Sequence, residues 1–267
     1  MDRPVLGDEE MEAVLSVLRS GHLVQGSRVE SFETMLAQEL GMASAVCCTS
    51  GTASLHLALT AHGCGPGDEV IAPAFGFPAT ANAVELCGAR AVLADVDLER
   101  FALDPASVEA VAGPRTVGVI PVHPFGMLAP MGALEAIAEE RGWWIVEDAA
   151  CSLGTTQGGR WGSGRHLTCL SFHPRKTLTT GEGGAVATDD PELGLRLRSL
   201  RNHGMVNEAS AGWRRFEHAG FNYRMTDLAG CLGEVQMGRL NQIVRDRRAV
   251  VSWYRERLAD NERVRWP

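Results

Sequence analysis

The chain has 267 residues, of which 45% are hydrophobic, 22% charged and 6% aromatic. These are the proportions of an ordinary globular protein, and they argue against collagen, coiled coil and extended disorder. A formal net charge of −8 argues against nucleic-acid binding, because proteins that neutralise phosphates usually carry a basic face. No stretch approaches eighteen apolar residues and the N-terminus lacks a signal-peptide pattern, so we expect a soluble, cytoplasmic protein that does not bind membranes.

The predicted elements alternate along the chain. Two amphipathic helices at 7–19 and 28–40, joined by a glycine-rich turn, form an N-terminal arm. Apolar, β-branched runs then predict strands, and helical periodicity predicts the segments between them. The strands are expected at 43–49, 69–73, 90–95, 116–122, 143–147, 167–172 and 184–188, and the intervening helices at 52–62, 78–86, 105–111 and 131–141. After a loop at 204–220, residues 226–258 are expected to form one long helix whose apolar stripe needs a partner from elsewhere.

This order of elements predicts an α/β domain. Strands that alternate with helices indicate a mostly parallel sheet with both faces covered, and about seven strands fit in one large domain. Ligands of such folds bind at the carboxyl ends of the strands. Candidate functional residues are therefore sought where the predicted strands end.

One residue type is distributed in an unusual way. Of the 25 basic residues 24 are arginine, and the only lysine is Lys176, which lies between the last two predicted strands on a loop shaped by Pro174 and several glycines. An arginine cannot form an imine, whereas a lysine amine can lose its proton and attack a carbonyl. The single lysine therefore favours covalent chemistry over a surface ion pair with Glu182.

Two other strand ends carry polar groups. Residues 49–56 are small and hydroxylic and lead from a strand into a helix, which suits a phosphate at the helix N-terminus; a simple N-cap by Ser50 or Thr52 is the alternative. Asp148 ends a buried strand, where a carboxylate can hold a cationic ring nitrogen; a helix cap or structural ion pair is the alternative. A phosphate cradle, an acid and a lone lysine together predict a pyridoxal phosphate site.

Other sites are not supported. The seven cysteines form no CxxC pair and mostly lie in apolar runs, so we expect reduced core residues and no metal. The eight histidines show no HExxH pattern, and no GxSxG elbow is present. The glycine-rich segment 158–164 lacks GxGxxG spacing and favours a turn over a dinucleotide site.

Several stretches of the sequence together resemble one known family. The sequence resembles the DegT/DnrJ/EryC1/StrS family of sugar aminotransferases, which have the fold type I architecture of pyridoxal phosphate enzymes. The resemblance covers nearly the whole chain. The matching stretches occur in order at 50–59, 65–71, 77–83, 147–150, 171–173 with Lys176 and 180–184, 201–204 and 222–225.

The resemblance implies a role for each matching position. Lys176 would be the catalytic Schiff-base lysine and would also move the substrate proton, while Asp148 would pair with the ring nitrogen. Phe77 would stack on the ring. Asn222 would reach the phosphate of a neighbouring subunit, so that a homodimer shares its active sites. The phosphate would be bound in its own subunit by Gly51, Thr52 and Ser171, and Ala53 and Cys151 would complete the cofactor-binding residues.

Two departures from the family pattern bear on function: the residue at position 151 and the small C-terminal domain. Cys151 stands where the family commonly has glutamine or histidine in contact with the cofactor, and a thiol is a weak hydrogen-bonding group. The expected organisation is an arm at 1–40, a cofactor-binding domain at 41–225 and a linking helix at 226–267 that leads to a small C-terminal domain which this chain lacks.

The resemblance implies transfer of an amino group, from glutamate or glutamine, to a keto group of a nucleotide-activated sugar or cyclitol. A sugar dehydratase on the same scaffold is an alternative, although such relatives have histidine at the lysine position. A truncated relative that binds the cofactor without turnover is the other alternative.

Overall fold

The computed structural model of the chain describes residues 4–155, 166–206, 214–264 and 266. Its helices are α1 (Asp8–Ser20), α2 (Ser27–Leu40), α3 (Gly51–Ala61), α4 (Ala79–Leu86), α5 (Pro105–Val111), α6 (Met131–Arg141), α7 (Pro191–Arg201), α8 (Asp227–Gly238) and α9 (Leu240–Arg257), with a short 3₁₀ turn at Pro124–Gly126. Its strands are β1 (Ser44–Cys48), β2 (Glu69–Pro73), β3 (Arg90–Ala94), β4 (Thr116–Val119), β5 (Trp144–Asp148), β6 (Leu167–Ser171), β7 (Gly184–Thr188), β8 (Met205–Val206) and β9 (Arg215–Phe216). Within these residues no helix is both long and apolar enough to cross a bilayer.

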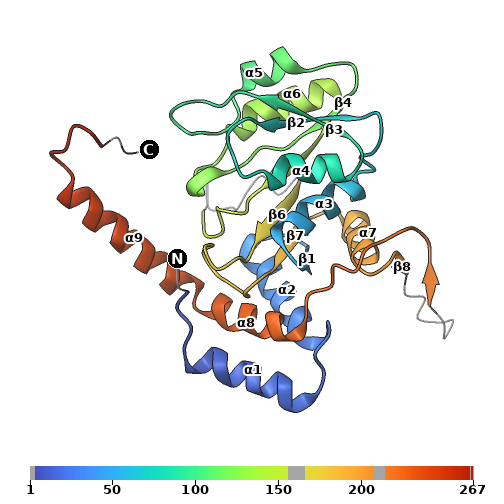
Figure 1. The fold of residues 1–267 in the computed structure, drawn as a ribbon, viewed down its shortest axis with the longest axis vertical. Coiled ribbons are helices and arrows are strands. Elements are labelled where there is room, and N and C mark those ends of the chain that lie inside the picture. Colours follow the sequence, from blue (N-terminus) through green and yellow to red (C-terminus); the bar gives the residue numbers. More distant parts are fainter. Residues whose placement is uncertain (1–3, 156–165, 207–213, 265, 267) are drawn as a thin grey trace.

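A seven-stranded sheet forms the centre of the molecule. Its strand order is β1-β7-β6-β5-β4-β2-β3, and β7 alone runs antiparallel to its two neighbours. The other pairs are parallel, which confirms the predicted mostly parallel α/β sheet. A separate two-stranded ribbon, β8 with β9, lies in the segment predicted as a loop (Figure 1).

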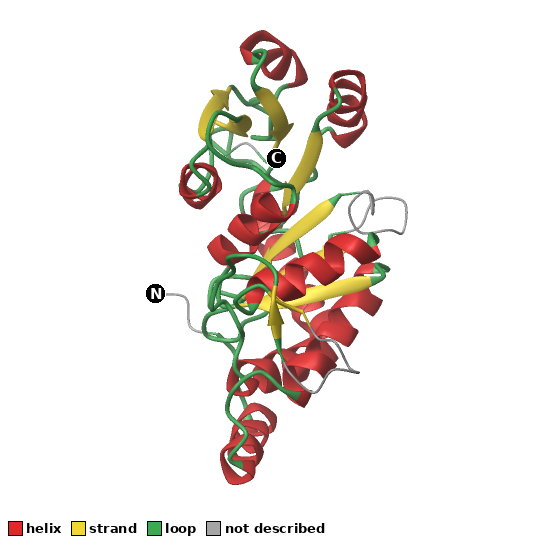
Figure 2. Ribbon diagram, turned by 90° about the vertical axis from the view of Figure 1, so that its right-hand side faces the viewer, coloured by secondary structure: helices red, strands yellow, loops and turns green. Residues whose placement is uncertain are grey.

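Helices cover both faces of the sheet (Figure 2). Side chains alternate between the two faces of a strand. Val46 and Cys48 of β1 accordingly pack in one core cluster with α3 and α7, whereas Ala45 and Cys47 pack in another with α2. Val146 of β5 belongs to the first cluster, and the strands at the far side of the sheet pack in a third cluster with α5 and α6. The core therefore consists of two apolar layers separated by the sheet.

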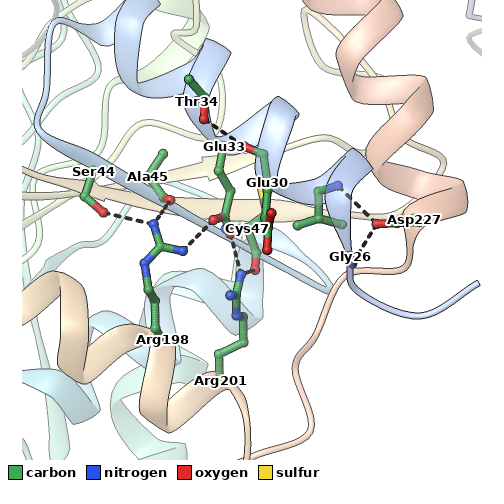
Figure 3. A network of polar contacts seen from close by, with 11 residues as sticks. Gly26, Glu30, Glu33, Thr34, Ser44, Ala45, Cys47, Arg198, Arg201 and Asp227 are labelled. Atoms are coloured by element: carbon green, nitrogen blue, oxygen red, sulfur yellow. Dashed lines mark hydrogen bonds and ion pairs between the residues drawn. The ribbon is translucent and has the colours of Figure 1, made fainter. Parts of the chain in front are cut away.

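The N-terminal arm is anchored to the end of the chain. Helix α2 begins after Gly26, which offers no side-chain cap, and Asp227 of α8 supplies the acceptor instead. One Asp227 carboxylate oxygen accepts hydrogen bonds from the backbone N–H groups of Gly26 (2.8 Å) and Val29 (3.1 Å), as Figure 3 shows in part. A carboxylate at a helix N-terminus satisfies otherwise unpaired donors and interacts favourably with the helix dipole. The cap ties α2 to α8 across nearly the whole sequence.

The prediction of one long helix after residue 226 was wrong. The structure has two helices, and Arg239 between them departs from helical geometry with φ −108° and ψ 6°. The Arg239 guanidinium binds the carboxylate of Glu10 in α1, and Gly238 before it lowers the helix propensity at this point. Helix α9 then leaves α8 at an angle and projects from the body of the molecule (Figure 1). The break thus coincides with a contact to a helix more than two hundred residues earlier in the chain.

His62 at the end of α3 makes stability depend on pH. Its ring stacks on Trp144 with centroids 5.1 Å apart, and its Nε2 is buried without a hydrogen-bond partner among the described residues. Burial lowers the pKa of His62 to about 4, and the positive charges of His166 and Arg196 act in the same direction. The unfolded chain therefore binds a proton at a pH at which the folded chain does not.

We expect this histidine to destabilise the fold progressively as the pH falls from about 6.5 toward 4. The destabilisation by His62 is absent well above pH 6.5, where the ring is neutral in both the folded and the unfolded chain. Urea unfolding at pH 7 and at pH 4.5 measures the loss, and a His62→Gln variant should lose less stability over the same interval. An equal loss in the variant and the parent would show that His62 is not responsible.

Candidate active site

The candidate residues lie at the carboxyl ends of parallel strands. β1 ends before Gly51, β2 leads to Phe77, β5 ends at Asp148, and β6 ends at Ser171. Because β5 and β6 are neighbours and β1 is separated from β6 only by β7, these ends meet at one edge of the sheet. The fold thus collects residues that are far apart in the sequence.

Lys176 lies on an irregular loop between β6 and β7, as predicted. The loop is fixed by backbone contacts: the Lys176 N–H donates to the carbonyl of His173 (2.8 Å), and Arg247 of α9 donates to the carbonyl of Lys176 (2.7 Å). The Lys176 Nζ lies 3.2 Å from the Cys151 Sγ, not against Glu182. The amine is half-buried at the rim of the sheet, where it can reach a ligand.

Asp148 is a buried carboxylate with two donors. Its side chain is 6% exposed; Thr80 Oγ1 donates to one oxygen (2.7 Å) and the Ala150 N–H to the other (3.2 Å). A buried carboxylate needs hydrogen-bond donors, and it has about four acceptor positions, so two remain for a ligand. The residue therefore fits the cationic nitrogen of a pyridine ring.

Helix α3 and β6 form the proposed phosphate cradle. Ser50 caps α3 by accepting a hydrogen bond from the Ala53 N–H (3.1 Å), so the N-cap alternative is correct for this residue. A Cβ built on Gly51 would lie 2.8 Å from the Ser171 Cβ, so only glycine lets the first turn of α3 approach Ser171 this closely. The first N–H groups of a helix have no partner within it. These donors beside the Ser171 hydroxyl fit a phosphate.

Phe77 lies just before α4, and its side chain is 73% exposed. A ring exposed to this extent is accessible to a ligand at the end of β2. Stacking on an aromatic cofactor would cover it and would add a geometric preference to the burial.

Asn222 and Cys151 occupy different surroundings. Asn222 is exposed, and its backbone pairs with that of Asn202 in an antiparallel bridge. It therefore can face a second subunit, and its role there stays a prediction. Cys151 is exposed and contacts the lysine amine, which places the thiol at the candidate site. The glycine-rich segment 158–164 lies outside the described residues.

Two sets of residues at this edge escaped the sequence analysis. One is Thr80, whose hydroxyl binds Asp148. The other is the fully buried pair of His123 and Glu147, with Nε2 and a carboxylate oxygen 2.9 Å apart. The His123 Nδ1 accepts from the Ala129 N–H (3.1 Å), so Nε2 carries the proton and donates it to Glu147. Because side chains alternate along a strand, Glu147 lies on the sheet face opposite to Asp148. There its hydrogen bond to His123 ties the end of β5 to the loop after β4.

A cavity of about 480 Å³ borders Lys176. Part of its wall comes from α8 and α9, and its charged lining residues are Arg175, Lys176, Arg239, Asp246 and Arg247. Because Arg239 is paired with Glu10, the remaining cations Arg175, Lys176 and Arg247 face the one carboxylate of Asp246, and the lining keeps an excess of positive charge. Such a cavity suits an anionic small molecule.

The comparisons with known proteins agree with this geometry. The model of the DegT/DnrJ/EryC1/StrS aminotransferase family matches residues 4–266. GDP-perosamine synthase of Caulobacter vibrioides is 39% identical over 258 residues, which cover 96% of this chain and 69% of that protein. The spore coat polysaccharide biosynthesis protein SpsC of Bacillus subtilis is 40% identical over 262 residues, which cover 94% and 67%.

The fold of the chain is also similar to that of solved structures. S. venezuelae DesV in complex with a ketimine intermediate superposes with a TM-score of 0.88 at 38% identity, over 94% of this chain and 67% of that chain. Sheet order, family match and structural similarity point to one conclusion. The chain belongs to the DegT/DnrJ/EryC1/StrS aminotransferase family, whose members are pyridoxal-phosphate-dependent aminotransferases of fold type I.

Proposed function

We propose that this aminotransferase moves an amino group from glutamate or glutamine to a keto group of a nucleotide-activated sugar or cyclitol. The observation that carries the proposal is that Lys176 and Asp148 lie at one edge of the sheet. The positively charged cavity borders Lys176, and its lining includes none of the other candidate cofactor residues. Nucleotide sugars and glutamate carry a net negative charge, and glutamine carries an α-carboxylate, which matches the positive charge of the cavity.

The names of two relatives support the acceptor class. One relative is a GDP-perosamine synthase, and the other is a spore coat polysaccharide biosynthesis protein. Both names concern saccharides, and one contains a nucleoside diphosphate. We extend to this chain only the class of acceptor, a nucleotide-linked keto sugar or cyclitol.

The cofactor and the site residues would have separate chemical roles. When bound, pyridoxal phosphate supplies an aldehyde that takes up the amino group and a ring that stabilises the negative charge left by a lost proton. Lys176 would provide the amine that holds the aldehyde and, once released, would carry the proton between the substrate's Cα and C4′ of the cofactor. Asp148 would pair with the ring nitrogen, and Phe77 would cover the ring face. The α3 N-terminus at Gly51 and Thr52 would hold the phosphate, together with Ser171.

We further propose a cytoplasmic homodimer in which Asn222 of one subunit contacts the phosphate bound by the other. The exposed position of Asn222 supports this arrangement. Residues 1–40 would serve as the arm, residues 41–225 as the cofactor-binding domain, and residues 226–267 as the link to a smaller domain.

The test separates the proposed reaction from its alternatives. The chain is loaded with pyridoxal phosphate and mixed with glutamate or glutamine in the absence of an acceptor, and the release of the corresponding 2-oxo acid is measured. We expect about one equivalent per loaded site, followed by continued release when a nucleotide keto sugar is added. A panel of such sugars with different bases and keto positions then identifies the acceptor.

Two results would contradict the proposal. Loss of water from the sugar without consumption of an amino donor would indicate a dehydratase. Tight cofactor binding without any release of 2-oxo acid from either donor would indicate a binding protein.

A further inference from the structure

The carboxylate of Asp148 is contacted by a side chain of α4. Thr80 lies in the first turn of α4, 4% exposed, and its hydroxyl donates to Asp148 over 2.7 Å. The two residues are 68 positions apart and come from different elements. The contact therefore exists only because the fold brings α4 to the end of β5.

The hydroxyl is committed to this contact. A threonine within a helix usually bonds to the carbonyl one turn earlier or points to solvent. The hydroxyl of Thr80 instead reaches across to a buried carboxylate. Its β-branched side chain has few rotamers, so the backbone of α4 largely fixes the position of the oxygen. The Thr80 N–H also donates to the carbonyl of Phe77 (3.3 Å), which anchors the start of the helix.

In the proposed function, this short segment would serve two parts of the cofactor. Phe77 is placed to cover the face of a ring, and Thr80, three residues later, holds the acid that meets the ring nitrogen. With Thr80 on one oxygen and the Ala150 N–H on the other, the Asp148 carboxylate cannot rotate without losing a donor. The two hydrogen bonds therefore hold the carboxylate in one orientation.

We propose that Thr80 is a positioning residue that orients the Asp148 carboxylate to hold the ring nitrogen of the cofactor. The inference rests on the pyridoxal phosphate dependence used in the proposed function and adds a residue that acts through Asp148. It requires that removal of the Thr80 hydroxyl change the affinity for the cofactor and the pH titration of the bound cofactor, and not only the rate of amino transfer.

Four variants isolate the hydroxyl. Thr80→Val keeps the shape of the side chain and removes the oxygen, whereas Thr80→Ser and Thr80→Ala differ from each other only by that oxygen. Thr168→Val is the matched control, because Thr168 is fully buried in β6 and its Oγ1 has no hydrogen-bond partner among the described residues.

Three quantities are measured on each loaded protein. They are the Kd for pyridoxal phosphate by equilibrium dialysis, the pH midpoint of the absorption band of the bound cofactor, and kcat and KM for 2-oxo acid release from glutamate. For Thr80→Val and Thr80→Ala we expect a Kd raised about 10-fold, as for loss of one hydrogen bond to a charged group, and a shifted midpoint. We also expect kcat to fall more than KM changes. Thr80→Ser and Thr168→Val should resemble the parent.

The results distinguish the proposals. If Thr80→Val and Thr80→Ala titrate and bind cofactor like the parent, the positioning role is overturned. The same holds if Thr80→Ser and Thr80→Ala are impaired equally. Should Thr80→Val fail to fold, the serine and alanine pair still gives the answer. Failure of the proposed function itself would appear in the parent, as absent cofactor binding or absent donor turnover, before any variant is made.

Discussion

Replacement of Lys176 by alanine should lower the rate of amino transfer by at least ~100-fold and up to ~10,000-fold. The variant loses the amine that holds the cofactor aldehyde and the group that moves the substrate proton. Lys176→Arg should be equally inactive, because a guanidinium keeps its positive charge but cannot attack a carbonyl. The rate of 2-oxo acid release from glutamate, with cofactor in excess, measures both variants.

The matched control lies in the same loop. Glu182→Gln removes the exposed acid that would pair with Lys176 if the lysine were only an ion-pair partner, and it should leave the rate unchanged. A large loss in Glu182→Gln together with a small loss in Lys176→Arg would favour the ion pair and contradict the covalent role.

Replacement of Glu33 by glutamine should destabilise the fold by about 3–5 kcal/mol, the cost of breaking a buried ion pair. Glu33 is 4% exposed, and its two oxygens accept from Arg198 and Arg201, each over 2.5 Å (Figure 3). Arg201 is itself 3% exposed, so its charge would remain buried without a counter-ion. Urea denaturation followed by circular dichroism measures the free energy of unfolding.

Because Glu33 is buried among several partners, its replacement should cost more stability than the replacement of one partner of a surface ion pair. The same carboxylate accepts from the Cys47 N–H (2.8 Å), and Arg201 donates to the Cys47 carbonyl (2.6 Å), so α2, β1 and α7 are joined at one point. Glu30→Gln, on the exposed side of the same helix, is the control and should change stability by less than about 0.5 kcal/mol. Equal effects of the two substitutions would show that the buried network adds nothing.

Local patterns were sufficient for most of the sheet. The strands are short apolar runs between glycine, proline and aspartate residues, and the ends of β2 and β7 coincide with the predicted ones. Lys176 could be singled out because it is the only lysine. Its loop could be placed because Pro174 and the glycines exclude a regular helix there.

Helix α7 was missed although its signal is local. Asp190 accepts from the Glu192 and Leu193 N–H groups, and Pro191 occupies the first turn. An aspartate followed by proline is a typical helix start, and leucines at 193, 197 and 200 give the apolar face. The omission therefore reflects an overlooked pattern.

Other features could not be predicted from local sequence. The end of α8 depends on Arg239 meeting Glu10, and the capping of α2 depends on Asp227. The contact between Thr80 and Asp148 arises because β2 and β5 are close in the sheet while their residues are far apart in the chain. In each case a tertiary contact determines the local structure.

The central claim is that the amine of residue 176 holds the cofactor. The loaded chain is treated with borohydride, digested, and the pyridoxyl group located by mass spectrometry. In these 267 residues the only other primary amine is the α-amino group of the first residue, so the assignment is unambiguous. The account predicts the group on Lys176 and none after Lys176→Arg; cofactor that binds but is never fixed to this lysine would contradict it.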